Sequence, residues 1–372
     1  MTTPGQHPAP IPDWPAGSEF TLGVEDELLL VDEENHLLGA SAAPLLARLR
    51  AQAPADGVVK GEIFADEVEL ETPVCADAEE VARSLGGLRG SLVEQGARLM
   101  AAGVHPAADI GTAALTRSPR YDLLAAEFGG LLRTPTAGFQ VHVGVPDAAS
   151  AVLAFRGLRN RLALFRALAA GSPYWHGRDS GLACVRPAIL RSYPRTTMPP
   201  VLRSWDDYLD KVGRAISASE VPDYTYVCWE LRPQPRLGTI EVRVMDAQHS
   251  LATVAGLAAL VQGVARCAVE DPDPDDLPEE YLLDNDFRAC RHGLDAMVLD
   301  SDGCRRPLRE VAATAVAGAR RVLGPDGLAG SLDVVDDLLT RTPEPTRQRH
   351  LCEGRGMAAL LADLAARTMG RG

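Results

Sequence analysis

Carboxylates at alternating positions mark three segments of this chain, and their spacing is typical of a place where cations bind. The segments are Glu25–Glu27, Glu67–Glu71 and Thr239–Arg243, and each has the composition of a β-strand. Side chains two positions apart on a strand project from the same face of the sheet. Like charges at that spacing repel each other and lose hydration when covered, which favours a divalent metal between them. The sequence therefore predicts a metal-dependent site spread over several strands.

A further predicted strand, residues 139–145, carries a histidine among its polar positions. Its apolar residues alternate with Gln140, His142 and Gly144, which share the opposite face. Carboxylate ligands with few thiolates favour a hard cation such as Mg²⁺ or Mn²⁺, and Mg²⁺ typically enters with substrate phosphates. Arginines in the long loop at 172–200 would add bidentate contacts to phosphate oxygens. Metal, arginine and carboxylate together indicate phosphoryl transfer.

Each motif taken alone also has a simpler explanation. Alternating glutamates usually form the solvent-exposed face of an amphipathic sheet. A lone histidine on a strand is more often structural, and loop arginines usually bind water or nearby carboxylates. The chain has none of the patterns G-x-x-x-x-G-K-[ST], G-x-S-x-G or H-E-x-x-H, and no G-x-G-x-x-G after a strand. From the residues alone, metal-dependent phosphoryl chemistry and a solvated acidic face both stay open.

The elements that would position these residues alternate between strands and helices. We expect strands at 20–31, 61–73 and 139–145, and a hairpin formed by 224–232 and 238–246 with its turn at 233–237. Helices are expected at 43–52, after the cap residue Asp77, and at 149–170, 250–269, 305–323, 330–341 and 356–368. Half-polar alternation on the strands favours an antiparallel sheet with one working face. The sequence therefore predicts an α+β fold.

The domain organisation follows from where the candidate ligands lie. Residues 1–17 form a Pro-rich stretch without the features of a signal peptide, which predicts a flexible leader. The candidate ligands come from both ends of the first 250 residues, so these residues should fold as one unit. An acidic stretch at 271–276 is a candidate boundary. We predict a single catalytic domain at 18–372, helical from about residue 250.

Composition excludes several classes of protein. The chain has 372 residues, 46% of them hydrophobic, and a net charge of -14 that opposes binding to a nucleic-acid backbone. Its 7 cysteines form no C-x-x-C pair, so neither a zinc cage nor a disulfide framework is indicated. The apolar stretch 251–268 contains Thr253, Gln262 and Arg266, which favours a packed core helix over a membrane span. We expect a cytoplasmic protein without nucleic-acid or membrane partners.

Ordered sequence blocks resemble the YbdK-type carboxylate-amine ligases, the glutamate-cysteine ligase type 2 family. The first two blocks are TLGVEDEL at 21–28 and VE at 68–69 followed by TPVC at 72–75. Further blocks follow in order at 103–106, 138–145, 172–182, 193–196, 232–233 with 239–246, 288–296 and 347–349. The match runs from about residue 18 to the C-terminus.

The resemblance implies both a fold and a reaction. The fold would be that of glutamine synthetase-like catalytic domains, a curved, mainly antiparallel sheet with helices packed on its outer face and with ATP and divalent cations on its concave face. The enzyme would be an ATP-dependent carbon-nitrogen ligase, which passes the γ-phosphate to a carboxylate and lets an amine displace phosphate from the acyl phosphate. Glutamate with cysteine is the activity attached to the family name, often weak. A homodimer is also implied.

The resemblance also assigns roles to residues of this chain. The implied metal ligands for Mg²⁺ or Mn²⁺ are Glu25, Glu27, Glu69, His142 and Glu241. The implied catalytic residues are Glu241, Arg243 and Arg232, and the implied residues that bind the ATP cofactor are Arg195, Arg232, Glu230 and Arg178.

Several positions depart from the family pattern or fall outside it. Gln140 stands where the family commonly has histidine, and it is predicted to alter metal or substrate preference because it cannot titrate. Asp26 replaces a common glutamate but points to the opposite face, so its change should matter little. Glu230 stands where aspartate is frequent, and Glu71 shares the acidic face but lies outside the matching motif. Two alternatives stay open: an ATP- and metal-binding protein that has lost ligase chemistry, and a metal-dependent phosphohydrolase.

Overall fold

The structure is a computed structural model that describes residues 9–17, 19–39, 42–52, 56–111, 113–272 and 275–370. Residues 1–8 of the predicted leader and residues 273–274 of the acidic stretch lie outside the described residues. Residues 9–17 lie against the body of the protein. Trp14 Nε1 donates to Val145 O at 3.1 Å, and the Trp14 ring packs edge-on against Trp205 at 5.2 Å between centroids.

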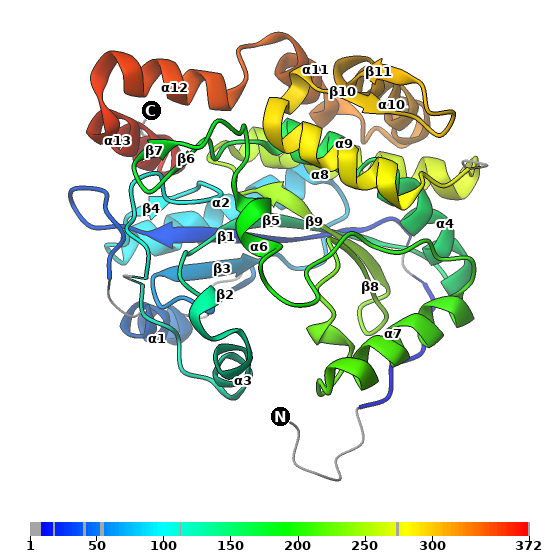
Figure 1. The fold of residues 1–372 in the computed structure, drawn as a ribbon, viewed down its shortest axis with the longest axis horizontal. Coiled ribbons are helices and arrows are strands. Elements are labelled where there is room, and N and C mark those ends of the chain that lie inside the picture. Colours follow the sequence, from blue (N-terminus) through cyan, green and yellow to red (C-terminus); the bar gives the residue numbers. More distant parts are fainter. Residues whose placement is uncertain are drawn as a thin grey trace.

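An open, antiparallel, seven-stranded sheet forms the centre of the fold (Figure 1). The strand order is β2-β3-β1-β5-β9-β8, and β4 also pairs with β1. Its strands are β1 (Leu22–Leu30), β2 (Val58–Gly61), β3 (Glu67–Glu71), β4 (Leu99–Met100), β5 (Gly138–Gly144), β8 (Leu231–Gln234) and β9 (Thr239–Asp246). Two small hairpins lie outside this sheet: β6 (Tyr174–Trp175) with β7 (Arg178–Asp179), and β10 (Met297–Leu299) with β11 (Arg305–Pro307).

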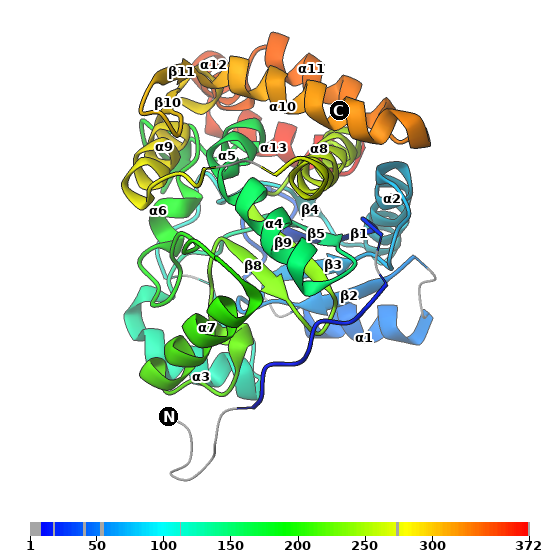
Figure 2. The same cartoon turned by 90° about the vertical axis from the view of Figure 1, so that its right-hand side faces the viewer.

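Helices cover one face of this sheet in two layers, as the two views in Figures 1 and 2 show. The first layer on the sheet consists of α2 (Ala78–Glu94), α4 (Ala148–Arg159), α5 (Leu162–Ala169) and α8 (Leu251–Glu270), and α13 (Met357–Thr368) also contacts the sheet, at β4. Beyond the first layer lie α9 (Glu279–His292), α10 (Leu308–Leu323), α11 (Asp333–Thr340) and α12 (Glu344–Arg355). The remaining helices are α1 (Ala43–Gln52), α3 (Pro119–Phe128), α6 (Arg186–Leu190) and α7 (Trp205–Ser219). Helices α3 and α7 lie on the other side of the sheet from α8 (Figure 1). The predicted α+β fold with a mainly antiparallel sheet is confirmed.

Helix α2 shows how the sequence specifies this packing. The Asp77 side chain accepts a hydrogen bond from Glu80 N at 2.7 Å, and the Glu80 side chain accepts one from Ala76 N at 2.8 Å. These two bonds satisfy backbone donors that the first turn leaves unpaired. Val81 and Leu85, one turn apart, are fully buried. The capping arrangement predicted at Asp77 is therefore confirmed.

Asp26 lies on the helix-covered face of β1. Arg89 on α2 donates to Asp26 Oδ2 from Nε at 3.0 Å and from Nη2 at 2.7 Å. Arg89 also donates to the backbone oxygens of Gln248 and His249, and Asp26 has 0% exposure. This buried ion pair joins the sheet to α2 and to the start of α8. The predicted placement of Asp26 on the face opposite Glu25 and Glu27 is confirmed.

We expect that Asp26→Ala lowers the free energy of unfolding by about 3 to 5 kcal/mol, because it leaves the Arg89 charge buried without its partner. Urea unfolding followed by circular dichroism measures this loss. Asp210→Ala is the matched control, since the Asp210–Arg214 pair is exposed and should change stability by less than about 1 kcal/mol. Equal losses in the two variants would contradict a structural role for the buried pair.

Several element boundaries differ from the sequence prediction. The strand expected at 61–73 is limited to β3 at Glu67–Glu71. The helix expected at 149–170 is divided into α4 and α5, because the Asn160 side chain binds the 275–277 segment, accepting from Leu277 N at 3.0 Å. The strand expected at 224–232 begins at Leu231 instead. Residues 224–226 form a 3-10 turn that the Asp223 side chain caps by accepting from Thr225 N at 2.8 Å. Five helices observed among the described residues were not predicted: α3, α6, α7, α9 and α12.

Helix α8 is the one element among the described residues that is long and apolar enough to cross a membrane. Of its most apolar window, 78% is buried inside the protein. Its neighbours are α4, α10, α2 and the sheet. Helix α8 is therefore packed in the core of the protein, as the sequence predicted.

Candidate functional site

Strand register brings the predicted site residues together on the sheet face opposite α8. Glu27 on β1 lies opposite Glu69 on β3. His142 on β5 lies opposite Glu241 on β9, and Glu241 in turn lies opposite Arg232 on β8. Because successive side chains of a strand alternate, this pairing gathers acidic and basic groups from five adjacent strands.

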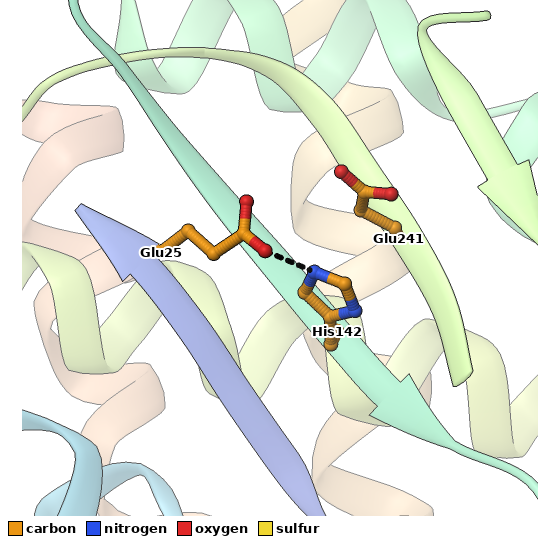
Figure 3. A group of neighbouring side chains, drawn as sticks. All are labelled: Glu25, His142 and Glu241. Atoms are coloured by element: carbon orange, nitrogen blue, oxygen red, sulfur yellow. Dashed lines mark ion pairs between the residues drawn. The ribbon is translucent and has the colours of Figure 1, made fainter. Parts of the chain in front are cut away.

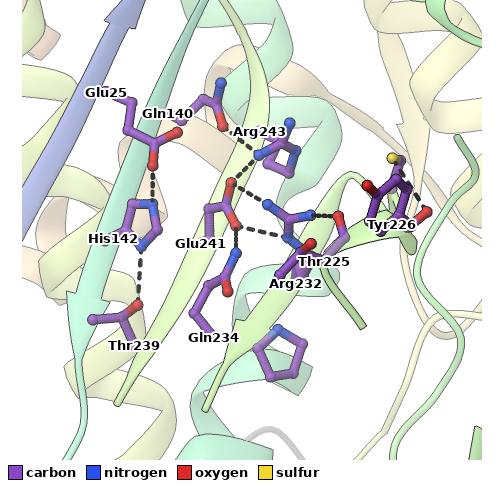
Figure 4. Close-up of polar contacts among 12 residues, drawn as sticks. Glu25, Gln140, His142, Thr225, Tyr226, Arg232, Gln234, Thr239, Glu241 and Arg243 are labelled. Atoms are coloured by element: carbon purple, nitrogen blue, oxygen red, sulfur yellow. Dashed lines mark hydrogen bonds and ion pairs between the residues drawn. The ribbon is translucent and has the colours of Figure 1, made fainter. Parts of the chain in front are cut away.

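A cavity of about 280 Å³ lies over this face. Its walls include the predicted residues Glu25, Glu27, Glu69, Glu230, Arg232 and Arg243. His142 and Glu241 are not among its described lining residues; both are buried, and Glu241 contacts Arg243, which also contacts Gln140 (Figure 4). A larger cavity, of about 630 Å³, lies among α4, α8 and α10, and no predicted site residue lines it.

Glu25, His142 and Glu241 form the first group of potential metal ligands (Figure 3). One ligand atom from each lies within 4.8 Å of the others. His142 Nδ1 lies 2.9 Å from Thr239 Oγ1, which orients the ring so that Nε2 faces Glu25 Oε1 at 3.2 Å. His142 Nε2 is buried, and its angle to Glu25 does not make a hydrogen bond. A buried imidazole nitrogen without a hydrogen-bond partner, beside two carboxylates, fits a cation ligand.

The two carboxylates of this first group favour the protonated form of His142. Burial lowers the pKa of His142, but Glu25 and Glu241 raise it above its ordinary value overall. Burial raises the pKa of Glu25, yet the contact with His142 and its charge lower it overall. A cation bound at Nε2 would replace that proton and would neutralise the two carboxylates in its place.

Glu241 also anchors two arginines (Figure 4). Arg232 Nε donates to Glu241 Oε2 at 2.9 Å, Gln234 Nε2 donates to the same oxygen at 2.6 Å, and Arg243 contacts Oε1. Burial raises the pKa of Glu241, but Arg232 and Arg243 lower it well below its usual range. The predicted shared face of Glu241 and Arg243 is confirmed, and Glu241 stays ionised at neutral pH.

Glu27, Glu62 and Glu69 form a second group, again with ligand atoms within 4.8 Å of one another. Burial and then the charge of Glu27 raise the pKa of Glu62 to about 7. Burial and then the charge of Glu62 raise the pKa of Glu69 well above its ordinary value. Carboxylates that hinder one another's ionisation in this way gain most from a divalent cation among them. The group therefore fits a hard metal ion.

Backbone and amide groups hold Glu27 in this second group. Glu27 Oε2 accepts from Gly138 N at 2.5 Å, and Oε1 accepts from Gln140 Nε2 at 2.6 Å. A side chain at position 138 would displace the Arg186 guanidinium from its present place beside this amide. The Gln140 oxygen in turn accepts from Arg243. Gln140 therefore links the second acidic group to an arginine that contacts Glu241.

Glu62 was missed by the sequence prediction. It follows β2 directly, and no alternation of carboxylates marks it in the sequence. Ile63 N donates to Glu62 Oε2 at 3.0 Å, and the Tyr121 hydroxyl donates to the same oxygen at 3.4 Å. Glu71, by contrast, contacts Lys60 and is not among the described residues that line the cavity.

Only some of the predicted nucleotide-binding residues lie at the cavity. Arg232 lines the cavity, and so does Glu230, whose carboxylate accepts from Arg166 at 2.5 Å and from Arg191 at 3.4 Å. Arg195 is bound to Glu127 at 2.5 Å and to the Tyr226 oxygen at 3.0 Å. Arg178 is exposed on β7. Neither Arg195 nor Arg178 is among the described residues of the cavity wall, and their roles stay predictions.

Comparison with known proteins shows the family that the chain resembles. The model of the family described as "Glutamate-cysteine ligase family 2 (GCS2)" matches residues 21–347. The "Putative glutamate--cysteine ligase 2-3" of Rubrobacter xylanophilus is 35% identical over 363 residues, which is 94% of this chain and 97% of that protein.

Solved structures share the fold at low sequence identity. The crystal structure of a glutamate-cysteine ligase from Francisella tularensis in complex with AMP has a TM-score of 0.73 and 13% identity, covering 96% of this chain and 90% of that one. A bifunctional glutathione synthetase from Pasteurella multocida has a TM-score of 0.67 and 13% identity, covering 95% of this chain and 52% of that one.

Proposed function

Because the chain belongs to glutamate-cysteine ligase family 2, we propose that it is an ATP-dependent carboxylate-amine ligase that works through an acyl phosphate. A substrate carboxylate oxygen attacks the γ-phosphorus of ATP, and the bond to ADP breaks. An amine nitrogen then attacks the acyl carbon. The new C–N bond forms as the C–O bond to phosphate breaks, which releases phosphate and one proton.

The observation that carries this proposal is the meeting of two acidic groups and two arginines on one sheet face, where Glu25 of the first group, all three members of the second and both arginines line one cavity. Glu25, His142 and Glu241 would hold one Mg²⁺ or Mn²⁺, and Glu27, Glu62 and Glu69 a second. When bound, such cations neutralise charge on the nucleotide phosphates. Gly138 N, Gln140 and Thr239 keep the ligand side chains in place by the hydrogen bonds described above.

Arg232 and Arg243 are proposed to bind the phosphate oxygens or the substrate carboxylate. Glu241 holds Arg232 at Nε, and the Thr225 backbone oxygen holds its Nη1 at 3.0 Å, which fixes the plane of the guanidinium. A planar donor fixed before the substrate arrives gives bidentate contacts without reorganisation during the reaction. No covalent enzyme nucleophile is needed in this chemistry.

Glutamate as the acid and cysteine as the amine are the proposed first candidates, with weak activity. The name of the Rubrobacter xylanophilus relative supports this pair. We further propose a single catalytic domain at 18–372, a cytoplasmic location and a homodimer.

The test is to measure ADP release with ATP, Mg²⁺ and panels of acids and amines. Release that requires both an acid and an amine is expected, with an amide product detected by mass spectrometry. ADP release that is independent of any amine would contradict ligation. Tight ATP binding without turnover would favour a protein that has lost the chemistry, and phosphate release from simple phosphoesters without nucleotide would favour a hydrolase.

A further inference from the structure

Helix α3 forms part of the cavity wall and contacts the turn that holds Arg232. The side chains of α3 that line the cavity are Arg120, Tyr121, Leu124 and Phe128. The 3-10 turn Tyr224–Tyr226 borders the same cavity, because Tyr226 also lines it. Figure 1 shows α3 on the side of the sheet opposite α8. A helix and a turn from distant parts of the chain therefore meet at this site.

Arg120 joins the helix to the turn. Its Nη1 donates to Thr225 Oγ1 at 2.9 Å, and its Nη2 donates to Thr225 O at 3.2 Å. The guanidinium carbon lies 4.3 Å from the centroid of the Tyr226 ring, over the ring face, where the ring attracts a cation. Arg120 is exposed, so it holds the turn from the outer rim of the cavity.

The Thr225 backbone oxygen is shared between Arg120 and Arg232. It accepts from Arg232 Nη1 at 3.0 Å as well as from Arg120, and a carbonyl oxygen has a lone pair for each. On the opposite edge of the Arg232 guanidinium, Nε and Nη2 donate to Glu241 at 2.9 and 3.2 Å (Figure 4). The plane of Arg232 is therefore held at two edges, and Thr225 supplies one of them.

The other contacts of Thr225 do not hold this oxygen. Asp223 Oδ1 accepts from Thr225 N at 2.8 Å and from Thr225 Oγ1 at 2.6 Å. These bonds fix the amide and the hydroxyl, whereas the two guanidinium groups contact the carbonyl oxygen. A change at Arg120 therefore reaches Arg232 through a single shared acceptor.

We propose that Arg120 is a positioning residue, which fixes the guanidinium plane of Arg232 through the Thr225 backbone oxygen. This inference rests on the proposed ligase function, in which Arg232 binds phosphate oxygens or the substrate carboxylate. Each Nη of Arg232 carries two hydrogens and uses one in the contacts above, so the other can meet an anionic oxygen. Helix α3 thus prepares Arg232 for its ligand before the ligand arrives.

A direct contact between Arg120 and the substrate is the main alternative, because Arg120 itself lines the cavity. Its directed contacts, however, go to Thr225 and to the face of Tyr226. A ligand contact and a positioning role also differ in what they predict. A residue that binds the ligand itself contributes independently of Arg232, whereas a residue that acts through Arg232 contributes only when Arg232 is present.

Helix α3 has further anchors that keep it in place when Arg120 is changed. At its other end, Arg195 donates to both carboxylate oxygens of Glu127, at 2.5 and 2.9 Å. The Phe128 ring stacks on Tyr193 with the centroids 5.3 Å apart. A substitution at the exposed Arg120 should therefore leave the fold intact, which urea unfolding verifies.

Arg120→Met tests the proposal in the full-length protein, since methionine still covers the Tyr226 ring but donates no hydrogen bond. We expect kcat/KM for amine-dependent ADP release to fall about 5- to 10-fold. Arg117→Met is the matched control, because Arg117 precedes the same helix, is 86% exposed and pairs with Asp122 instead. It should leave kcat/KM unchanged.

The same substitution in an Arg232→Lys background separates positioning from ligand contact. Lysine keeps the charge of Arg232 but lacks the planar fork that Thr225 and Glu241 hold. Arg120→Met should then lower kcat/KM by less than about twofold, because its effect depends on Arg232. ADP release over long incubations measures the slow variants. A full 5- to 10-fold loss in this background would mean that Arg120 contacts the substrate itself, and the inference would be wrong.

Nuclear magnetic resonance of protein with ¹⁵N-labelled arginine reads the position of Arg232 without any turnover. The Arg232 signals are assigned by their loss in Arg232→Lys. We expect solvent exchange of the Arg232 guanidinium hydrogens to be about 3- to 10-fold faster in Arg120→Met and unchanged in Arg117→Met. Unchanged exchange in Arg120→Met overturns the positioning role whether or not the protein is a ligase.

The failures of the two proposals can therefore be told apart. If ADP release depends on the amine and Arg120→Met leaves kcat/KM unchanged, this inference is wrong and the ligase function stands. If wild-type ADP release is independent of any amine, the proposed function is wrong, and the exchange measurement alone decides whether Arg120 positions Arg232.

Discussion

Glu241→Gln is expected to lower the rate of amine-dependent ADP release about 100- to 1000-fold, a loss typical of removing one fixed charge from a reaction site. Glu241 is fully buried and meets three donors, from Arg232, Arg243 and Gln234. Glutamine keeps the shape but removes the charge that orients the two guanidinium groups and completes the group with Glu25 and His142. Coupled-assay rates at saturating ATP measure the effect.

The choice of glutamine follows from the structure. Glu241→Ala would leave Arg232 and Arg243 without their shared partner, and losing one member of a buried ion pair typically lowers the free energy of unfolding by about 3 to 5 kcal/mol. An inactive alanine variant would therefore not separate chemistry from folding. Urea unfolding of Glu241→Gln provides the control. A folded Glu241→Gln enzyme with wild-type turnover would remove Glu241 from the site.

Mg²⁺ or Mn²⁺ is expected to stabilise the metal-free protein, by about 2.7 kcal/mol when the free cation is at 100 times its Kd. The physical reason is the mutual repulsion of Glu27, Glu62 and Glu69, which a cation relieves. Thermal unfolding with increasing MgCl₂ or MnCl₂, after treatment with chelator, measures the gain. Glu69→Gln should lose most of it, whereas Glu71→Gln should retain it.

The same group gives this stabilisation a defined pH dependence. The pKa of Glu62 is about 7 in the folded protein, above its ordinary value of 4.5, because of burial and then the charge of Glu27. A carboxyl with a raised pKa binds its proton more tightly when folded, so the contribution of Glu62 to metal-free stability is fully present below pH 4.5 and is lost as pH rises through about 7. Cation binding must displace that proton, so the gain from Mg²⁺ should be larger at pH 8 than at pH 5.5. Equal gains at both pH values would contradict a cation at this group.

Local alternation was enough to predict which face of each strand carries the chemistry. Glu25 and Glu27 line the cavity, while Asp26 between them pairs with Arg89 beneath α2. Alternation has a period of two residues, and it depends on backbone geometry that every strand shares. The α+β class and the capped start of α2 were predictable for the same reason, because they follow from short-range patterns.

Element boundaries were less predictable where side chains from distant segments intervene. The break between α4 and α5 depends on Asn160 meeting the 275–277 segment, more than 110 residues away. The late start of β8 depends on the 3-10 turn capped by Asp223. Periodicity over a short window contains no information about such contacts.

The sequence by itself determined that acidic residues and one histidine share a working face, and its ordered blocks indicated the ligase family. Only the tertiary structure decided which of these groups meet: Glu25 with His142 and Glu241, and Glu27 with Glu69 and with Glu62, which no pattern had marked. The side on which a residue projects follows from its own strand, whereas its neighbours depend on the register between strands distant in the chain. That register is set by backbone hydrogen bonds and core packing over the whole sheet, so the partners appear only in the folded protein.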